Sequence, residues 1–220
     1  MSHSILIVDD HKLMATGYKS ILENNDLGIH FTFTIATTLS EAYAIITNPE
    51  NTQAFDIIFL DRSMPAYPEK KLHSGEDLIA VIRQFLLTPK VVILTSIAEK
   101  FSVYDIIHKN RPDGMMIKSD ADDETLMECV TTILNNQSYH STLVREALKE
   151  EIITKGHFDT IDRQIITLLS QGFRNATIAE KLGLSASAVE KRKSKIKDYL
   201  KVIGKDEEIV LECRRLGYVA

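Results

Sequence analysis

Short apolar runs alternate with longer helical patterns over the first part of the chain. The runs lie at 5–8, 31–35, 57–60, 91–94 and 115–117, and four of the five are nearly continuous. Unbroken apolar runs of this length are typical of parallel strands that are buried on both faces. Helical patterns lie between and after them, at 13–24, 40–47, 75–85, 101–109 and 122–136. Five β–α repeats predict an α/β doubly wound, five-stranded parallel sheet, whose ligands bind beyond the carboxyl ends of the strands.

The pattern changes after residue 137. Residues 138–157 are polar and partly helical, and we interpret them as a linker. From residue 158 onward only helical patterns remain, and they lie at 159–171, 176–182, 186–200 and 206–216. Ser185 is a natural N-cap for the third helix, and Gly172 and Gly183 mark turns. The sequence therefore predicts a first domain at 1–137 and an all-α four-helix domain at 158–220.

Composition restricts the class of protein. The chain is 44% hydrophobic and 26% charged, which is typical of a globular protein. No apolar run approaches the ~20 residues that span a bilayer, and the N-terminus lacks the features of a signal peptide. We therefore expect a cytoplasmic protein without a membrane partner. Cys129 and Cys213 lie far apart in helical patterns, which favours reduced core thiols over a disulfide or a metal site.

The net charge of −5 is unevenly distributed. Residues 158–220 carry 12 Lys and Arg against 9 Asp and Glu, whereas residues 1–157 carry 14 against 22. Five of the basic residues fall within 191–197. An acidic first part and a locally basic second part indicate two domains with different partners.

Charged and hydroxyl side chains follow the predicted strands. The first strand runs into Asp9 and Asp10, the third into Asp61, the fourth into Thr95 and the fifth into Lys118. In a doubly wound sheet these positions meet at one edge. Carboxylates in one cleft repel each other, and Mg²⁺ relieves this repulsion while accepting hard oxygen ligands. A carboxylate can attack phosphorus while Mg²⁺ and a lysine neutralise the phosphoryl oxygens, so the pattern predicts phosphoryl transfer.

These residues resemble the receiver domain of two-component response regulators, which has a flavodoxin-like fold. The match runs through Asp9-Asp10, Asp61-x-x-Met64-Pro65, Thr95-Ser96 and Lys118, and the opening Asp9-Asp10-His11 with Gly17 is similar to the NarL/FixJ branch. The resemblance implies that Asp61 is the phosphoacceptor. It also implies Mg²⁺ ligands at Asp10, Asp61 and the backbone carbonyl of Ser63, a metal-bound water held by Asp9, and phosphoryl contacts from Thr95 and Lys118.

The chain departs from the receiver pattern at two places. Met115 stands three residues before Lys118, where receivers usually have Tyr or Phe. The methionine either fills the same pocket or indicates that the activation signal leaves by another face. The stretch 66–74 is about five residues longer than is usual, and it either tunes access to the site or is a tolerated surface insertion.

A helix–turn–helix pattern lies within the second domain. Ile178 and Leu182 form the apolar face of a short helix, a turn follows at Gly183, and Val189 and Ile196 lie on one side of the next helix. Basic residues occupy the other positions of that second helix. A short helix, a tight turn and a basic second helix are the features of a DNA reader that places the second helix in the major groove.

Residues 158–220 resemble the four-helix LuxR-type DNA-binding domain over its whole length. The last helix of that family is often a dimer contact. Arg192 stands where histidine or tyrosine is common, so base specificity does not carry over. We predict that bases are contacted by Lys191 and by either Lys193 or Ser194, and that phosphates are contacted by Asn175, Thr177, Ser187, Arg192, Lys195 and Lys197. The alternative is a helical protein-interaction module with a solvated basic face.

These expectations combine into a phosphorylation-controlled transcriptional regulator that is not an enzyme. A sensor histidine kinase would phosphorylate Asp61, and a homodimer would then bind double-stranded DNA. One alternative is a phosphatase with an aspartyl-phosphate intermediate, but dehalogenase-like hydrolases carry two Asp residues two apart after the first strand, whereas Asp9 and Asp10 are adjacent. Another alternative is a regulator that works without phosphorylation or through a protein contact.

Overall fold

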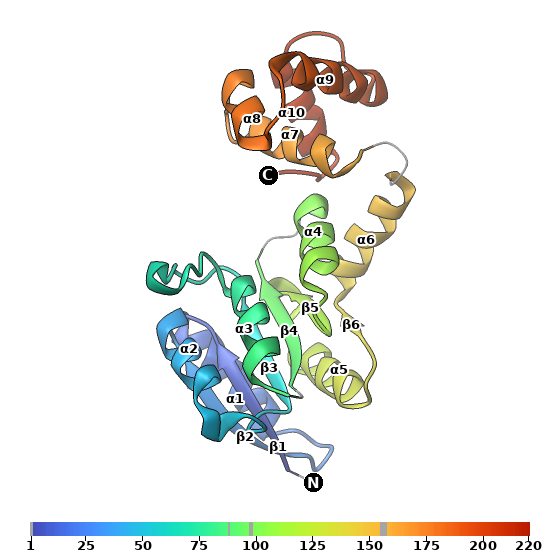
Figure 1. The fold of residues 1–220 in the computed structure, drawn as a ribbon. Coiled ribbons are helices and arrows are strands. Elements are labelled where there is room, and N and C mark those ends of the chain that lie inside the picture. Colours follow the sequence, from blue (N-terminus) through green and yellow to red (C-terminus); the bar gives the residue numbers. More distant parts are fainter. Residues whose placement is uncertain (1, 88, 97–98, 155–157) are drawn as a thin grey trace. The chain divides into compact units, whose positions relative to one another are not determined.

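The computed structural model describes residues 2–87, 89–96, 99–154 and 158–220. The chain divides into two compact units, and Figure 1 follows its elements along the chain. The first unit is formed by Met1–Ala98 and Ile106–Arg145, and the second by Glu99–Asp105 and Glu146–Ala220.

The first unit is built around a parallel sheet in the order β2-β1-β3-β4-β5-β6. The strands are β1 Ser2–Val8, β2 His30–Ala36, β3 Ile57–Asp61, β4 Lys90–Thr95, β5 Gly114–Ile117 and β6 Tyr139–His140. The prediction of a doubly wound parallel sheet is confirmed, with six strands in place of five. The sixth strand has only two residues, which is too short to produce a recognisable apolar pattern.

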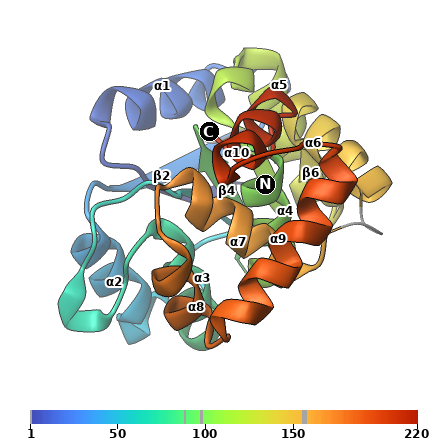
Figure 2. The same cartoon turned by 90° about the horizontal axis from the view of Figure 1, so that it is seen from above.

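Helices lie on both faces of this sheet. They are α1 Lys12–Glu23, α2 Leu39–Thr47, α3 Leu78–Phe85, α4 Lys100–Asn110 and α5 Asp123–Leu134, and α4 spans the division between the two units. Helices α1 and α5 pack together on one face, and α2 and α3 pack together on the other (Figures 1 and 2). Ile5 and Ile7 belong to the core under α1 and α5, while their neighbours Leu6 and Val8 are also fully buried. Burial on both faces explains the continuous apolar runs of the sequence.

The stretch that we interpreted as a linker carries regular structure. It contains β6 and the helix α6 Thr142–Thr154, and residues 155–157 lie outside the described residues. Ser141 is fully buried, and its hydroxyl accepts a hydrogen bond from the backbone N–H of Ile117 at 3.2 Å. The beginning of this stretch therefore extends the sheet of the first unit.

The second unit contains the four predicted helices. They are α7 Thr160–Ser170, α8 Asn175–Leu182, α9 Ala186–Leu200 and α10 Asp206–Arg215. The hydroxyl of Ser185 accepts from the backbone N–H of Ala188 and caps α9, as predicted. Gly183 ends α8 in the left-handed conformation at φ 63°, where a side chain would be strained. Val189 and Ile196 lie in the core on the inner side of α9.

Among the residues that the structure describes, no helix is long and apolar enough to cross a membrane. Cys129 and Cys213 are both buried and free, and burial raises the pKa of each thiol well above its usual range. Buried thiols of this kind are unreactive core residues, which agrees with the prediction for both cysteines.

Candidate phosphoacceptor site and nucleic-acid interface

The carboxyl ends of the central strands bring the predicted residues of the first unit together. Asp9 follows β1, Asp61 ends β3 and Thr95 ends β4, and their exposed fractions are 0%, 1% and 0%. Lys118 follows β5 and is also largely buried. Polar side chains at such depth need partners, because an unpaired buried charge is strongly destabilising.

Lys118 joins two of the carboxylates. Its Nζ lies 2.8 Å from Asp9 Oδ2 and 2.9 Å from Asp61 Oδ2. Burial lowers the pKa of Lys118, but the hydrogen bonds and charges of Asp9 and Asp61 outweigh this effect, so the pKa lies above its ordinary value. The lysine is therefore held as a cation between the predicted phosphoacceptor and its neighbour.

The carboxylates outnumber this one cation. Ligand atoms of Asp9, Asp10, His11 and Asp61 all lie within 4.8 Å of one another. Asp61 Oδ2 and Asp10 Oδ1 are buried atoms. Among the described residues, the first is paired with Lys118 Nζ at 2.9 Å and the second with His11 Nδ1 at 2.9 Å. Clustered carboxylate oxygens with lone pairs available for coordination fit a hard divalent cation such as Mg²⁺.

His11 is a neighbour of this site to which the sequence analysis gave no role. Its Nδ1 lies 3.4 Å from Asp9 Oδ1, and its backbone N–H donates to the same oxygen at 2.9 Å. The ring is mostly exposed. Its position directly after the two aspartates was the signal that could have indicated it.

The backbone around Asp61 depends on Gly75. A Cβ at residue 75 would lie 1.8 Å from the backbone oxygen of Asp61, so only glycine fits there. The Gly75 N–H donates to the carbonyl of Arg62 at 2.9 Å. The Ser63 N–H donates to Asp61 Oδ1 at 3.0 Å, which fixes the carboxylate from its own loop.

The long stretch 66–74 is a folded loop. Tyr67 and Leu72 form an antiparallel bridge, and Leu72 is buried. The Tyr67 ring meets Tyr43 of α2 edge-on at 6.2 Å, and Lys70 Nζ lies 5.0 Å from the centre of the Tyr43 ring. The loop is thus anchored against α2.

Met115 is fully buried in β5 and pairs in register with Ile93 of β4 and His140 of β6. A buried thioether at this position fits the interpretation that methionine fills the space usually given to an aromatic ring. The direction in which an activation signal leaves stays a prediction.

Helix α9 carries exposed side chains on the side away from the core of the second unit. The predicted DNA contacts on α9 and α8 differ in how far they are exposed. Ser187, Lys191, Ser194 and Lys195 are exposed, Arg192 and Lys197 of α9 and Asn175 and Thr177 of α8 are half-buried, and Lys193 has an exposed fraction of 3%. Of the two alternatives for the second base contact, exposure favours Ser194 over Lys193.

Acidic residues at the start of α7 hold two of the basic side chains. Arg192 Nη1 lies 2.7 Å from both Asp159 and Asp162, and Lys195 Nζ lies 3.3 Å from Asp162. Asp162 has no exposed surface. The hydrogen bonds to Asp159 and Asp162 raise the pKa of Arg192 above its ordinary value. Arg192 is therefore fixed on α9 by a neighbouring helix.

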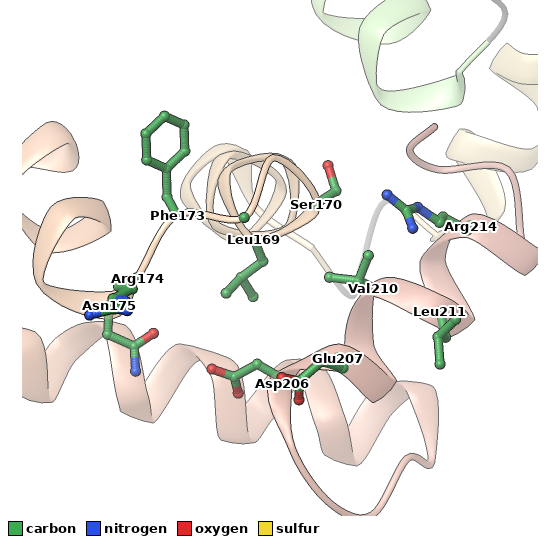
Figure 3. A pocket seen from close by; sticks show the side chains of 11 residues that line it. Leu169, Ser170, Phe173, Arg174, Asn175, Asp206, Glu207, Val210, Leu211 and Arg214 are labelled. Carbon is green, nitrogen blue, oxygen red and sulfur yellow. The ribbon is translucent and has the colours of Figure 1, made fainter.

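Asp206 at the start of α10 holds two further basic side chains of α9. Lys193 Nζ lies 2.5 Å from Asp206 Oδ2, and Lys197 Nζ lies 3.2 Å from Asp206 Oδ1. Burial raises the pKa of Asp206, but the bonds from the two lysines outweigh it, so the pKa is below its ordinary value. Figure 3 shows Asp206 and Asn175 on the wall of a pocket whose apolar lining includes Leu169 and Val210.

Known proteins resemble the chain over nearly its whole length. The oxygen regulatory protein NreC of Staphylococcus haemolyticus (strain JCSC1435) is 27% identical over 216 residues, which cover 92% of this chain and 93% of the relative. The protein of the same name from Staphylococcus aureus (strain JH9) is 27% identical over 218 residues with the same coverage.

Solved structures share the fold. RcsB from Salmonella enterica serovar Typhimurium, bound to promoter rprA in the presence of phosphomimetic BeF3−, aligns with a TM-score of 0.61 at 18% identity, covering 97% of this chain and 99% of that one. The response regulator ChrA of a heme-sensing two-component system aligns with a TM-score of 0.51 at 22% identity, covering 98% of each chain.

A family model described as the response regulator receiver domain matches residues 5–131, more than half of the chain. The chain therefore belongs to the response regulator receiver-domain family.

Proposed function

We propose that the protein is a phosphorylation-controlled DNA-binding transcriptional regulator and not an enzyme in the usual sense. The observation that carries the proposal is the placement of Lys118 between Asp9 and Asp61, in a buried cluster with more carboxylates than cations. Such a site can accept a phosphoryl group and clamp it. The RcsB structure bound to a promoter supports DNA binding as the output of the fold.

In the proposed reaction, a sensor histidine kinase supplies the phosphoryl group. A carboxylate oxygen of Asp61 forms a bond to phosphorus while the P–N bond to the donor imidazole breaks, and the imidazole leaves after taking up a proton. Lys118 Nζ, already 2.9 Å from Asp61, then pairs with the new phosphoryl oxygens. Thr95, buried at the end of β4, is the second proposed phosphoryl contact.

Mg²⁺ is the proposed cofactor. Asp10, Asp61 and the backbone carbonyl of Ser63 would hold it, with Asp9 bonded to one of its waters. When bound, the ion supplies positive charge that neutralises the phosphoryl oxygens. The clustered carboxylate oxygens support this ligand set.

Double-stranded DNA is the proposed target of the second unit, bound by a homodimer when the protein is phosphorylated. One small helix-turn-helix makes too few contacts for strong specific binding at physiological salt, so pairing is required. The exposed Lys191 and Ser194 are the proposed base contacts. A cytoplasmic location is part of the same proposal.

Selection from a pool of random duplex DNA tests this function. The full chain and its Asp61→Asn variant are each incubated with the pool, with and without beryllofluoride and Mg²⁺, and the retained duplexes are sequenced. We expect a palindromic motif whose enrichment increases with the mimic only when Asp61 is present. Enrichment that ignores the mimic would contradict phosphorylation control, and no enrichment in any condition would favour a helical protein-interaction module.

A further inference from the structure

The outward side of α9 contains an acid among its basic and hydroxyl residues. Ser187, Glu190, Lys191 and Ser194 are all exposed and follow one another at helical spacing, opposite the buried Val189. In a helix-turn-helix, this side of the second helix enters the major groove, and the residues near its start contact base edges. Glu190 therefore lies among the side chains that would meet bases.

The carboxylate of Glu190 is held in place although its side chain is 57% exposed. Its Oε1 accepts hydrogen bonds from Lys193 Nζ at 3.0 Å and from the side-chain amide of Asn175. Lys193 is itself fixed, because it is almost fully buried and lies 2.5 Å from Asp206 Oδ2. Groups from α8, α9 and α10 thus combine to orient one surface carboxylate.

Asn175 and Lys193 both take part in this arrangement through their polar side-chain atoms. The side chain of Asn175 donates to Glu190 through its nitrogen and accepts from Lys193 through its oxygen at 3.0 Å. Lys193 Nζ contacts Asn175, Glu190 and Asp206, which accounts for its three donor hydrogens. These two residues have few groups left for DNA, which differs from the roles that the sequence suggested for them.

From this geometry we propose that Glu190 is a specificity-determining residue that accepts a hydrogen bond from the exocyclic amino group of a cytosine in the major groove. Asn175 and Lys193 are its positioning residues. The inference rests on the proposed DNA-binding function of the second unit. A carboxylate near phosphates opposes binding to every sequence. The N4 amino group of cytosine, however, gives the carboxylate a hydrogen-bond donor at a place in the major groove where the other bases do not present one. A preoriented carboxylate loses little freedom when it forms that bond.

The competing explanation is that Glu190 is only a negative charge that weakens DNA binding in general. Asp198 provides the matched control, because it is also an exposed acid on α9 but lies two turns further along the helix. Glu190→Gln and Asp198→Asn each remove one negative charge with little change in shape. A general charge effect appears in both variants, whereas a base-reading effect appears in one.

The test compares the motifs that the full-length wild type, Glu190→Gln and Asp198→Asn enrich from random duplex DNA, with Mg²⁺ and beryllofluoride. We expect the wild-type motif to contain a cytosine position that changes toward adenine in Glu190→Gln, because glutamine pairs with the N6 and N7 edge of adenine. On fixed duplexes, that single-base change should alter relative affinity roughly tenfold or more for the wild type. Asp198→Asn should keep the wild-type motif.

An unchanged motif in Glu190→Gln, with affinity raised equally for all sequences as in Asp198→Asn, would overturn the inference. A third variant, Asn175→Ala, tests positioning: it should lower the preference at the same motif position more than at the others, whereas a purely structural role would weaken all positions alike. Circular dichroism establishes that each variant is folded. If the wild type enriches no motif, the proposed function itself fails, so the two failures are distinguishable.

Discussion

The candidate phosphoacceptor site and helix α9 both place basic side chains against carboxylates, but in opposite proportions. In the first, Lys118 lies between Asp9 and Asp61, with Asp10 and His11 beside them. In the second, basic residues at 192, 193, 195 and 197 are each paired with an acid from another helix. One region has an excess of buried negative charge, and the other has most of its positive charge compensated.

This difference indicates how each region selects its partner. An excess of carboxylates in a buried cleft attracts a divalent cation and repels other anions until that cation is bound. A compensated helix gains less from general phosphate attraction, so a larger share of its selectivity must come from groups that remain exposed, such as Lys191. The following predictions test the two sides of this comparison, from the largest expected effect to the smallest.

Asp61→Asn should abolish phosphorylation by a small-molecule acyl phosphate, because the amide is not a nucleophile toward phosphorus. Phosphate-affinity gel electrophoresis of the full chain measures the modified fraction. Glu69→Gln, on the exposed part of the loop beside the site, is the control and should be modified like the wild type. Modification of the Asp61→Asn protein at the wild-type level would place the phosphoacceptor elsewhere.

Lys118→Met should destabilise the protein in the absence of Mg²⁺ by about 3 kcal/mol, because two nearly unexposed carboxylates lose their common cation. Added Mg²⁺ should recover part of the loss by binding the folded state. Urea unfolding with and without Mg²⁺ measures both effects. Lys19→Met, which removes an exposed lysine paired with Glu23, should have little effect in either condition. Equal stability of the two variants without Mg²⁺ would contradict the buried ion pair.

Gly75→Ala should cost roughly 2–3 kcal/mol of unfolding free energy, because its Cβ would overlap the backbone oxygen of Asp61 and force the loop to move. Gly17→Ala is a matched control inside α1, where a Cβ meets nothing within 4 Å, and it should stabilise the protein by about 0.5–1 kcal/mol. Thermal or urea unfolding measures both changes. A neutral Gly75→Ala would mean that the backbone at Asp61 is not constrained as described.

Asp206→Asn should reduce the acid sensitivity of the protein. The pKa of Asp206 is depressed in the folded state, so its contribution to stability is present above its unfolded pKa of about 3.9 and is lost as the pH falls through the folded value. The wild type should therefore lose more stability between about pH 5 and pH 3 than the variant, by less than about 1 kcal/mol because the site is partly exposed. Urea unfolding at several pH values across this range gives the free energy of unfolding of both proteins. If the ion pairs of Asp206 with Lys193 and Lys197 contribute nothing, this free energy will change with pH equally in the wild type and in Asp206→Asn.

The sequence predicted that the residues of the candidate phosphoacceptor site lie together, because the fold itself brings the strand ends to one place. The carboxyl ends of parallel strands meet at one edge, so Asp9, Asp61 and Lys118 could be assigned to one site from their positions alone. The sixth strand was missed because two residues of strand produce no period. The stretch 138–157 was expected to be partly helical, but because it is largely polar it was interpreted as a linker.

The details of α9 could not be predicted in the same way. Its helical pattern, its cap at Ser185 and its core residues followed from local spacing, and all are present. The burial of Lys193 and the pairing of Arg192 depend on Asp206 and Asp162, which reach α9 only through the packing of other helices. Local spacing identifies a basic helix, but tertiary packing decides which of its charges remain available.

Phosphorylation of Asp61 is proposed to control DNA binding, and one affinity measurement tests this most directly. A duplex carrying the selected motif is titrated with the wild type and with Asp61→Asn, each with and without beryllofluoride and Mg²⁺, at fixed salt. We predict that the mimic strengthens binding of the wild type and leaves Asp61→Asn unchanged. Equal affinity in all four titrations would contradict the account.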